Sequence, residues 1–176
     1  DALPISSDKE KFDGVMLDIE PYISDSWKEN PEEYMDRYIS CMKKGYKFAQ
    51  KNHLRTAICI PRHYDNQGLT SGLEELIKET CDEVAVMNYS CGNEIEAIRT
   101  EAALSEKYGK ELHCILEFQE VGKHGLTENK TYRNKGIDNA KETWEKLQKE
   151  YKNINVTRDY HWSRPVREML EEKNAD

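Results

Sequence analysis

Asp18 and Glu20 are two carboxylates in an apolar stretch, residues 12–22, near the start of the 176-residue chain. Side chains of a strand alternate between its two faces, so Met16, Asp18 and Glu20 share one face, and the aliphatic residues between them point to the other. Two acids at the carboxyl end of a strand can hold and deliver a proton, and parallel α/β proteins build active sites at that end. They are candidate catalytic residues; the alternative is that they only cap the next helix.

The rest of the chain alternates between strand-like and helix-like patterns. Further strands are predicted at residues 54–61, 84–89, 112–118 and 154–162. Helices are predicted at residues 31–52, 72–79, 95–108 and 131–151, with one or two helical turns in the tail from residue 165. Because crossovers of helical length join parallel strands, the expected fold class is α/β with an all-parallel sheet.

Residue types mark two of the helix boundaries. Asn30 and Pro31 stand before two acids, an arrangement that is typical of a helix start. Gly109 follows the helix predicted at residues 95–108 and should end it, because glycine adopts the left-handed conformation of helix C-caps.

The lengths of the connections favour a (β/α) barrel. Long loops at residues 22–30, 62–71 and 120–130 follow strand carboxyl ends, whereas the connections at the other end are tight. No Gly-rich phosphate loop follows a strand, so the usual doubly wound nucleotide site is not expected. Since a complete barrel has eight units, residues 1–176 are expected to be the C-terminal part of a single (β/α)8 barrel, strands four to eight, with the upstream units outside this chain. An open sheet is the alternative.

Charge and composition argue against several kinds of partner. Acidic residues outnumber basic ones by 34 to 26, and the net charge of −8 argues against nucleic acid and anionic membranes. No apolar run approaches the ~20 residues that span a bilayer. The five cysteines form no CxxC pair, so neither a zinc site nor a disulfide framework is indicated. No cofactor and no metal are expected.

Three motifs, in order along the chain, resemble those of one enzyme family. Residues 13–20, Asp-Gly-Val-Met-Leu-Asp-Ile-Glu, resemble the DGxDxDxE signature on the fourth strand of the family 18 glycoside hydrolases, the chitinase-like TIM barrels. Met87-Asn88-Tyr89 resembles the Met-x-Tyr-Asp motif of the sixth strand, and Trp162 matches the tryptophan of the eighth. The resemblance extends over residues 12–165.

The chain departs from the family pattern at two acids. Met16 stands for the middle Asp of the signature, and Ser90 stands for the Asp after the tyrosine. The seventh-strand motif has no counterpart, and Glu117 and Gln119 occupy that region. The resemblance is therefore to a divergent member, and an alternative is a catalytically impaired carbohydrate-binding barrel or scaffold.

The resemblance implies hydrolysis of a polysaccharide that contains N-acetylhexosamine. Glu20 would be the general acid that protonates the leaving oxygen. The substrate's own acetamido oxygen would attack, with Asp18 orienting that group, Tyr89 donating a hydrogen bond to it and Trp162 supplying an apolar face for the sugar ring. Because polysaccharide hydrolases usually act outside the cytoplasm, the resemblance also favours a secreted or cell-envelope protein.

Several other residues at strand ends are candidates for substrate binding. Glu117 and Gln119 have the strand parity of His113, which places polar groups inside a barrel, where burial without partners is costly. The full substrate-binding set is Tyr22, Arg62, Met87, Glu117, Gln119 and Trp162. Some of these residues, and Trp27 and Tyr89, also have structural alternatives. Trp27 and Tyr22 either form a sugar-stacking wall or pack under their loop. Tyr89 and Trp162 could fill the core, and Arg62 could form a loop salt bridge.

A third functional alternative and two kinds of partner complete the expectations. The alternative is a metal-dependent barrel hydrolase that uses Asp18, Glu20 and a histidine such as His63, His113 or His161, although no His-x-His or HExxH spacing supports it. The expected partners are a carbohydrate ligand and a cover for the open strand edges, either the upstream barrel units or a second copy of the chain.

Overall fold

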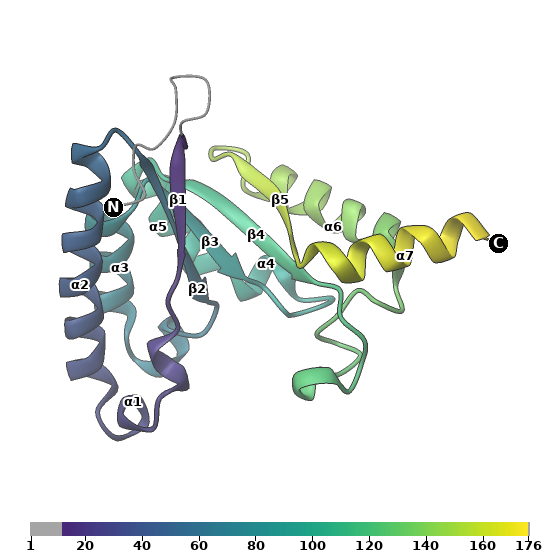
Figure 1. The fold of residues 1–176 in the computed structure, drawn as a ribbon, viewed down its shortest axis with the longest axis horizontal. Helices are drawn as coiled ribbons and strands as arrows, with labels where there is room; N and C mark the ends of the chain where they lie inside the picture. The colour runs from purple at the N-terminus through teal and green to yellow at the C-terminus, as the bar shows by residue number, and fades with distance from the viewer. Residues whose placement is uncertain (1–11, 176) are drawn as a thin grey trace. The chain divides into compact units, whose positions relative to one another are not determined.

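The computed structural model describes residues 12–175, an α/β fold with one five-stranded parallel sheet in the order β1-β2-β3-β4-β5 (Figure 1). The strands are β1 (Gly14–Asp18), β2 (Arg55–Pro61), β3 (Glu83–Met87), β4 (Glu111–Glu117) and β5 (Val156–His161). The helices are α1 (Asp25–Glu29), α2 (Pro31–Lys51), α3 (Thr70–Thr80), α4 (Glu94–Ala97), α5 (Arg99–Tyr108), α6 (Gly136–Glu150) and α7 (Ser163–Ala175). Short 3-10 turns are η1 (Pro21–Ile23), η2 (Asp65–Gln67) and η3 (Lys123–Gly125). The predicted α/β class with a parallel sheet is confirmed.

The chain divides into two compact units, residues 1–84 (unit 1) and residues 85–176 (unit 2). Each unit contains a parallel pair of strands with its own helices, and each is described by itself below. Every helix in the described part of the chain is too short or too polar to cross a membrane.

Unit 1 is built on the pair β1–β2, in which Asp18 is in register with Cys59. Helices α2 and α3 lie side by side along it (Figure 1). Helix α2 begins where the sequence predicts, with the Asn30 side chain accepting the Glu33 N–H. The helices approach closely at Gly72, where an added Cβ would lie 2.6 Å from Met35 Cγ. The central strand β2 is buried apart from its first residue.

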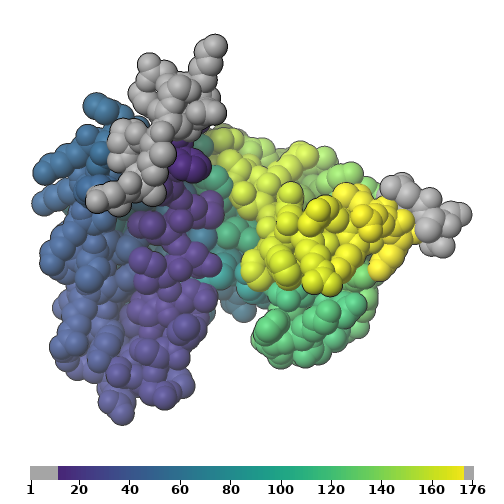
Figure 2. Space-filling model, in the orientation of Figure 1, coloured from purple at the N-terminus to yellow at the C-terminus, as the bar shows by residue number. Residues whose placement is uncertain are grey.

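Unit 2 is built on the pair β4–β5, in which Glu117 is in register with His161. Helix α6 covers one face of this pair, and its Trp144 indole donates a hydrogen bond to the Cys114 carbonyl (3.0 Å). Phe118 packs among aromatic rings on the same side. Helix α7, yellow at the surface in Figure 2, contacts α6 and β5. The other face of β4–β5 carries polar side chains, which form much of the candidate site.

The opening strand, β1, is shorter than predicted at both ends, and its end lies two residues before Glu20. It ends at Asp18, because the Glu20 carbonyl accepts the Ile23 N–H (3.2 Å) and starts the turn η1, whose first position is Pro21. Glu20 therefore lies at the strand exit rather than in the strand. Its side chain makes no capping hydrogen bond to η1, so the capping alternative is wrong for Glu20.

Three helix predictions differ from the structure. The helix predicted at residues 95–108 is interrupted at Ile98, which leaves the helical region (φ −125°), although Gly109 ends α5 with φ 63° as expected. The helix predicted at residues 131–151 starts only at Gly136, because Thr131 bonds back to the Gln119 carbonyl (2.6 Å) and holds the preceding segment in a turn. The tail forms the 13-residue helix α7, longer than predicted.

Candidate functional site

The predicted site residues fall into two groups, one in each unit. Unit 1 contains Asp18, Glu20, Tyr22 and Arg62, and unit 2 contains Met87, Tyr89, Glu117, Gln119 and Trp162. All of them lie at or just after the carboxyl end of a strand. Each group is a cluster with its own contacts.

Glu20 and Tyr22 form the centre of the unit 1 cluster. The turn η1 folds Tyr22 back so that its hydroxyl donates a hydrogen bond to Glu20 Oε1. Both side chains are half-buried. Burial raises the pKa of Tyr22, and the hydrogen bond to Glu20 and the charge of that carboxylate raise it further. Tyr22 therefore stays protonated near neutral pH and remains a donor to the carboxylate.

An aromatic cluster holds Tyr22 in place. Its ring meets His63 edge-on at 5.2 Å and Tyr64 at 6.1 Å. Tyr64 is fully buried and packs on Trp27 at 5.5 Å. Trp27 is only 3% exposed, so of its two alternatives the packing role is confirmed. Tyr22 and His63 are the half-buried members of this aromatic cluster.

Arg62 adjoins this cluster through its neighbour His63. Burial lowers the pKa of His63, and the positive charge of Arg62 lowers it further. The His63 imidazole is consequently neutral near pH 7. Against the Tyr22 ring, a neutral imidazole adds an apolar edge and a hydrogen-bonding nitrogen without adding charge.

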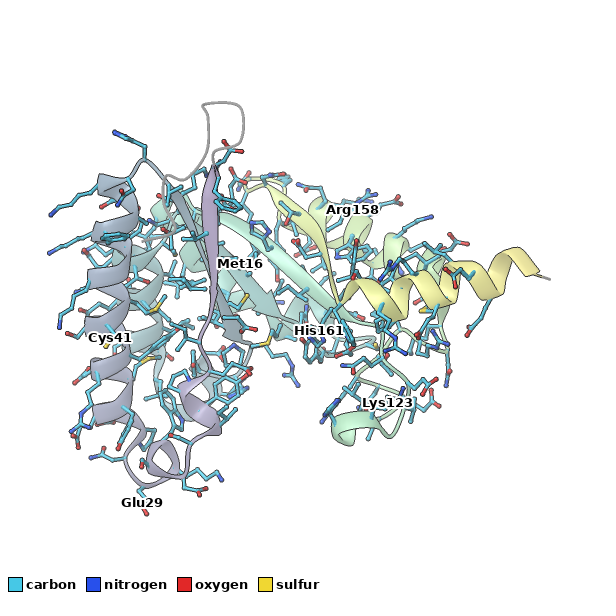
Figure 3. All side chains as sticks on the ribbon, in the orientation of Figure 1. Met16, Glu29, Cys41, Lys123, Arg158 and His161 are labelled. Carbon is cyan, nitrogen blue, oxygen red and sulfur yellow. The ribbon has the colours of Figure 1, made fainter. Side chains whose placement is uncertain are left out.

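Asp18 belongs to an exposed face of β1. Met16 is on the same face, is 52% exposed and is labelled on the strand in Figure 3. The Asp18 charge is near enough to Tyr22 and Tyr38 to be one of the causes that raise their pKa values, after burial. Asp18 and Glu20 are therefore both close to Tyr22, while Asp18 remains open to solvent.

Glu117 is the most firmly held acid of the unit 2 cluster. Its side chain is 1% exposed. Its Oε1 accepts the backbone N–H groups of Phe118 (2.8 Å) and Gln119 (2.7 Å), and its Oε2 accepts Gln119 Nε2 (3.1 Å) and His161 Nδ1 (2.9 Å). The prediction that Glu117 faces a ligand assumed that burial would leave it without partners. The protein itself supplies four donors.

The hydrogen bonds decide the charge of Glu117. Burial alone would raise the pKa of this carboxyl, but the hydrogen bond from His161, aided by the Gln119 donors and the His161 charge, outweighs burial and lowers it. Glu117 is therefore ionised near neutral pH and can only accept hydrogen bonds.

Tyr89 lies against His161, the exposed partner of Glu117. The Tyr89 and His161 rings are 5.9 Å apart and inclined by 31°. The chain that carries Met87 and Tyr89 is fixed by Asn88, which is 1% exposed and donates to the Glu94 carbonyl (2.9 Å). The motif at the end of β3 thus positions a tyrosine beside His161.

Trp162 lines a cavity of about 240 Å³ in unit 2. The indole is 45% exposed, and Gln119 also lines the cavity. Arg164 lines it as well, paired with Glu168 (2.8 Å). Trp162 is therefore not a core residue, and Gln119 connects the cavity to Glu117.

A second pair of an acid and a histidine lies further back on the same strands. His113 Nδ1 is 2.8 Å from Asp159 Oδ2, and Thr157 donates to the same oxygen (2.6 Å). Burial raises the pKa of Asp159, but the hydrogen bonds from His113 and Thr157 outweigh it and lower the pKa. The β4–β5 pair therefore presents two histidine–carboxylate pairs on one face.

His161 is the functional candidate that sequence reasoning considered only as a metal ligand. Glu117 and His161 are 44 positions apart, and nothing in either local pattern indicates that they pair. In the described part of the chain, no grouping of three metal-ligating side chains includes Asp18, Glu20, His63 or His161. The sequence did contain one signal: Glu117 and His161 each end a strand in which polar residues occupy alternate positions.

No protein-family model matches the chain, and neither a curated protein nor a solved structure matches it.

Proposed function

We propose that this chain is part of a glycoside hydrolase that acts on a polysaccharide containing N-acetylhexosamine, with Glu20 as the general acid. The observation that carries the proposal is the half-buried Glu20 carboxylate just after β1, which accepts the hydroxyl of Tyr22, a residue whose ring packs on His63. The resemblance of residues 13–20 to the family 18 signature supports the same assignment. In this proposal the chain supplies strands four to eight of a (β/α)8 barrel.

In the proposed reaction Glu20 gives its proton to the glycosidic oxygen as the bond to the anomeric carbon breaks. The acetamido oxygen of the substrate attacks that carbon while Asp18 accepts the acetamido N–H. Glu20, now a carboxylate, then takes a proton from the water that opens the cyclic intermediate. The Tyr22 hydroxyl stabilises the carboxylate form that Glu20 adopts between the two steps.

The unit 2 residues and Arg62 are assigned to substrate binding in this proposal. Tyr89 donates to the acetamido group, and Trp162 offers its exposed indole to a sugar ring. Gln119 can bond a sugar hydroxyl at the cavity that Trp162 lines. Met87 and Arg62 contribute apolar and cationic surface at the ends of their strands.

The proposal is tested by the release of reducing ends from a panel of N-acetylhexosamine glycans by the full-length protein. Glu20→Gln removes the acidic proton at nearly constant shape and should lower the rate by about 10²–10⁴-fold. Glu29→Gln is the matched control, since Glu29 is exposed on α1 (Figure 3) and should leave the rate unchanged. Full activity of Glu20→Gln would refute the proposal.

A carbohydrate-binding protein without turnover is the second candidate. It is favoured by Met16 and Ser90, which stand where the family has carboxylates, and by the exposed Trp162 beside its cavity. Calorimetry distinguishes the two candidates. Binding that is lost in Trp162→Ala, in a protein that hydrolyses no glycan of the panel, selects the second candidate.

The barrel assignment makes a prediction about the surface of unit 1. Met16, Ile19 and Ile23, on or just after the edge strand β1, are 52%, 46% and 69% exposed, and the unpaired edge of a parallel sheet can accept a further strand. We assign this surface to contact with a further barrel unit. Sedimentation velocity tests it: a stable monomer of the 176-residue chain would count against the barrel, and self-association lost in Ile23→Ser would support it.

A further inference from the structure

We propose that His161 is a proton-transferring residue of unit 2 and that Glu117 is the positioning residue that fixes its tautomer. The inference goes beyond the glycosidase mechanism above, in which neither residue moves a proton. It rests on contacts within unit 2 and is independent of Glu20.

The hydrogen bonds of Glu117 decide where the His161 proton lies. Three of its four hydrogen bonds are donated to it, two by backbone N–H groups and one by the Nε2–H of Gln119. The carboxylate is ionised, so the fourth contact, 2.9 Å from His161 Nδ1, must also be donated to it. Nδ1 therefore carries the proton in the neutral ring, and Nε2 is the nitrogen that accepts another.

Exposure separates the roles of the two residues. Glu117 is 1% exposed and cannot reach a ligand in solution, whereas His161 is 46% exposed at the end of β5 (Figure 3). Tyr89 adds a second constraint on the imidazole, with the two rings 5.9 Å apart. A buried acid that orients an accessible imidazole is the arrangement by which proteins prepare histidine for proton transfer.

The neighbouring pair shows that this arrangement is not simply how the strands satisfy polar groups. His113 also meets a carboxylate through Nδ1 at nearly the same distance, 2.8 Å. There the exposures are reversed: the histidine is 13% exposed and Asp159 is 33% exposed. The histidine of that pair is the more buried partner, which suits a structural role.

The proposed step is a proton transfer to and from oxygen. The O–H bond of a water or alcohol breaks, its proton goes to His161 Nε2, and its electron pair forms the bond to the carbon under attack. The C–O bond of the substrate, an ester, breaks with its electrons on the leaving oxygen, which takes the proton back from Nε2. Glu117 stabilises the intermediate imidazolium without being protonated.

Nitrogen-15 NMR of the histidine rings in the full chain tests the inference. The expected result for His161 is the neutral tautomer protonated at Nδ1. In Glu117→Gln this preference should be lost, and the midpoint of the His161 titration should move to lower pH by about one unit, because the adjacent negative charge is removed. Glu117 of β4 and Tyr89 after β3 are titratable neighbours of the ring within unit 2.

Asp159→Asn is the matched control, since it removes the acid of the neighbouring pair and should change His113 but not His161. If Glu117→Gln does not fold, the wild-type tautomer still decides, and a His161 protonated at Nε2 overturns the inference. On any ester that the protein hydrolyses, His161→Gln should lower kcat at least about tenfold with little change in KM, whether or not Glu20 acts on glycans. Unchanged kcat on every hydrolysed ester also overturns it.

Discussion

Glu20 in unit 1 and Glu117 in unit 2 are carboxylates at the carboxyl ends of their strands, yet the structure holds them differently. Glu20 lies two residues beyond β1, is half-buried, and accepts the Tyr22 hydroxyl. Glu117 is the last residue of β4, is 1% exposed, and accepts four hydrogen bonds. The same side chain has been placed in two electrostatic environments.

The difference teaches what each acid can do. A carboxylate with four donors keeps its charge and serves to orient other groups. A carboxylate beside one tyrosine hydroxyl, with part of its surface open, remains available to exchange a proton with a ligand. Position at a strand end is therefore insufficient to identify a catalytic acid. The two roles are separated by how many hydrogen-bond donors the carboxylate has and by the exposed fraction of its side chain.

The largest expected effect is on stability, from removal of Glu117. Glu117→Ala leaves two backbone N–H groups, Gln119 and His161 without their acceptor, and should lower the free energy of unfolding by about 2–3 kcal/mol. Glu20→Ala should cost less than about 1 kcal/mol, because only the Tyr22 hydroxyl loses a partner. Urea unfolding at pH 7 measures both. Equal losses would remove the contrast between the two acids.

The next effect concerns acid stability. The folded pKa of Glu117 lies below its usual value of 4.5, so its contribution is fully present above that pH and is lost as pH falls through the folded pKa. The stability of the wild type should therefore fall below about pH 4.5 more steeply than that of Glu117→Gln. Urea midpoints at pH 6, 4 and 3 give the comparison. Parallel curves would show that Glu117 is not the buried anion inferred here.

A smaller effect is expected at Tyr22. Tyr22→Phe keeps the ring against His63 but removes the donor to Glu20, and should lower stability by about 1 kcal/mol. If Glu20 is the acid, the rate of glycan hydrolysis should also fall, by about tenfold. Tyr34→Phe is the control, since the Tyr34 ring stacks under Arg37 and survives the change. A rate unaffected by Tyr22→Phe would separate Tyr22 from the proposed mechanism.

The smallest expected effect comes from Met16→Asp. The side chain is 52% exposed, so stability should change by less than about 0.5 kcal/mol. The change restores the carboxylate of the family signature on the face that carries Asp18, and a severalfold faster release of reducing ends is expected if Asp18 orients the acetamido group. A slower enzyme would show that the exposed β1 face does not work as the resemblance implies.

Local sequence signals predicted most elements of the fold. Asn30 and Pro31 marked the start of α2, and Gly109 marked the end of α5. Apolar runs located all five strands, and helical crossovers predicted that they are parallel. Two of the misses have a local cause: Thr131 bonds to the Gln119 carbonyl instead of entering α6, and the Glu20 carbonyl starts a turn instead of extending β1.

The candidate site was predictable only in part. The acids and aromatic residues at strand ends could be named from their types and spacing, but their surroundings could not. Trp27 lies in the short helix α1 and Trp162 between β5 and α7, yet the first is 3% exposed and the second 45%. Their difference depends on what packs against them, namely the Tyr64 ring for Trp27 and a cavity for Trp162.

The sequence by itself determined which residues form strands, which face of a strand each side chain takes, and that acids end two of the strands, because periodicity and turn chemistry act over a few residues. Only the tertiary structure decided that Glu117 meets His161 and that His113 meets Asp159. Those pairs depend on the register of β4 against β5, a strand pair on which α6 packs and donates a hydrogen bond from Trp144 to the Cys114 carbonyl. A shift of the register would keep every local pattern and lose both pairs.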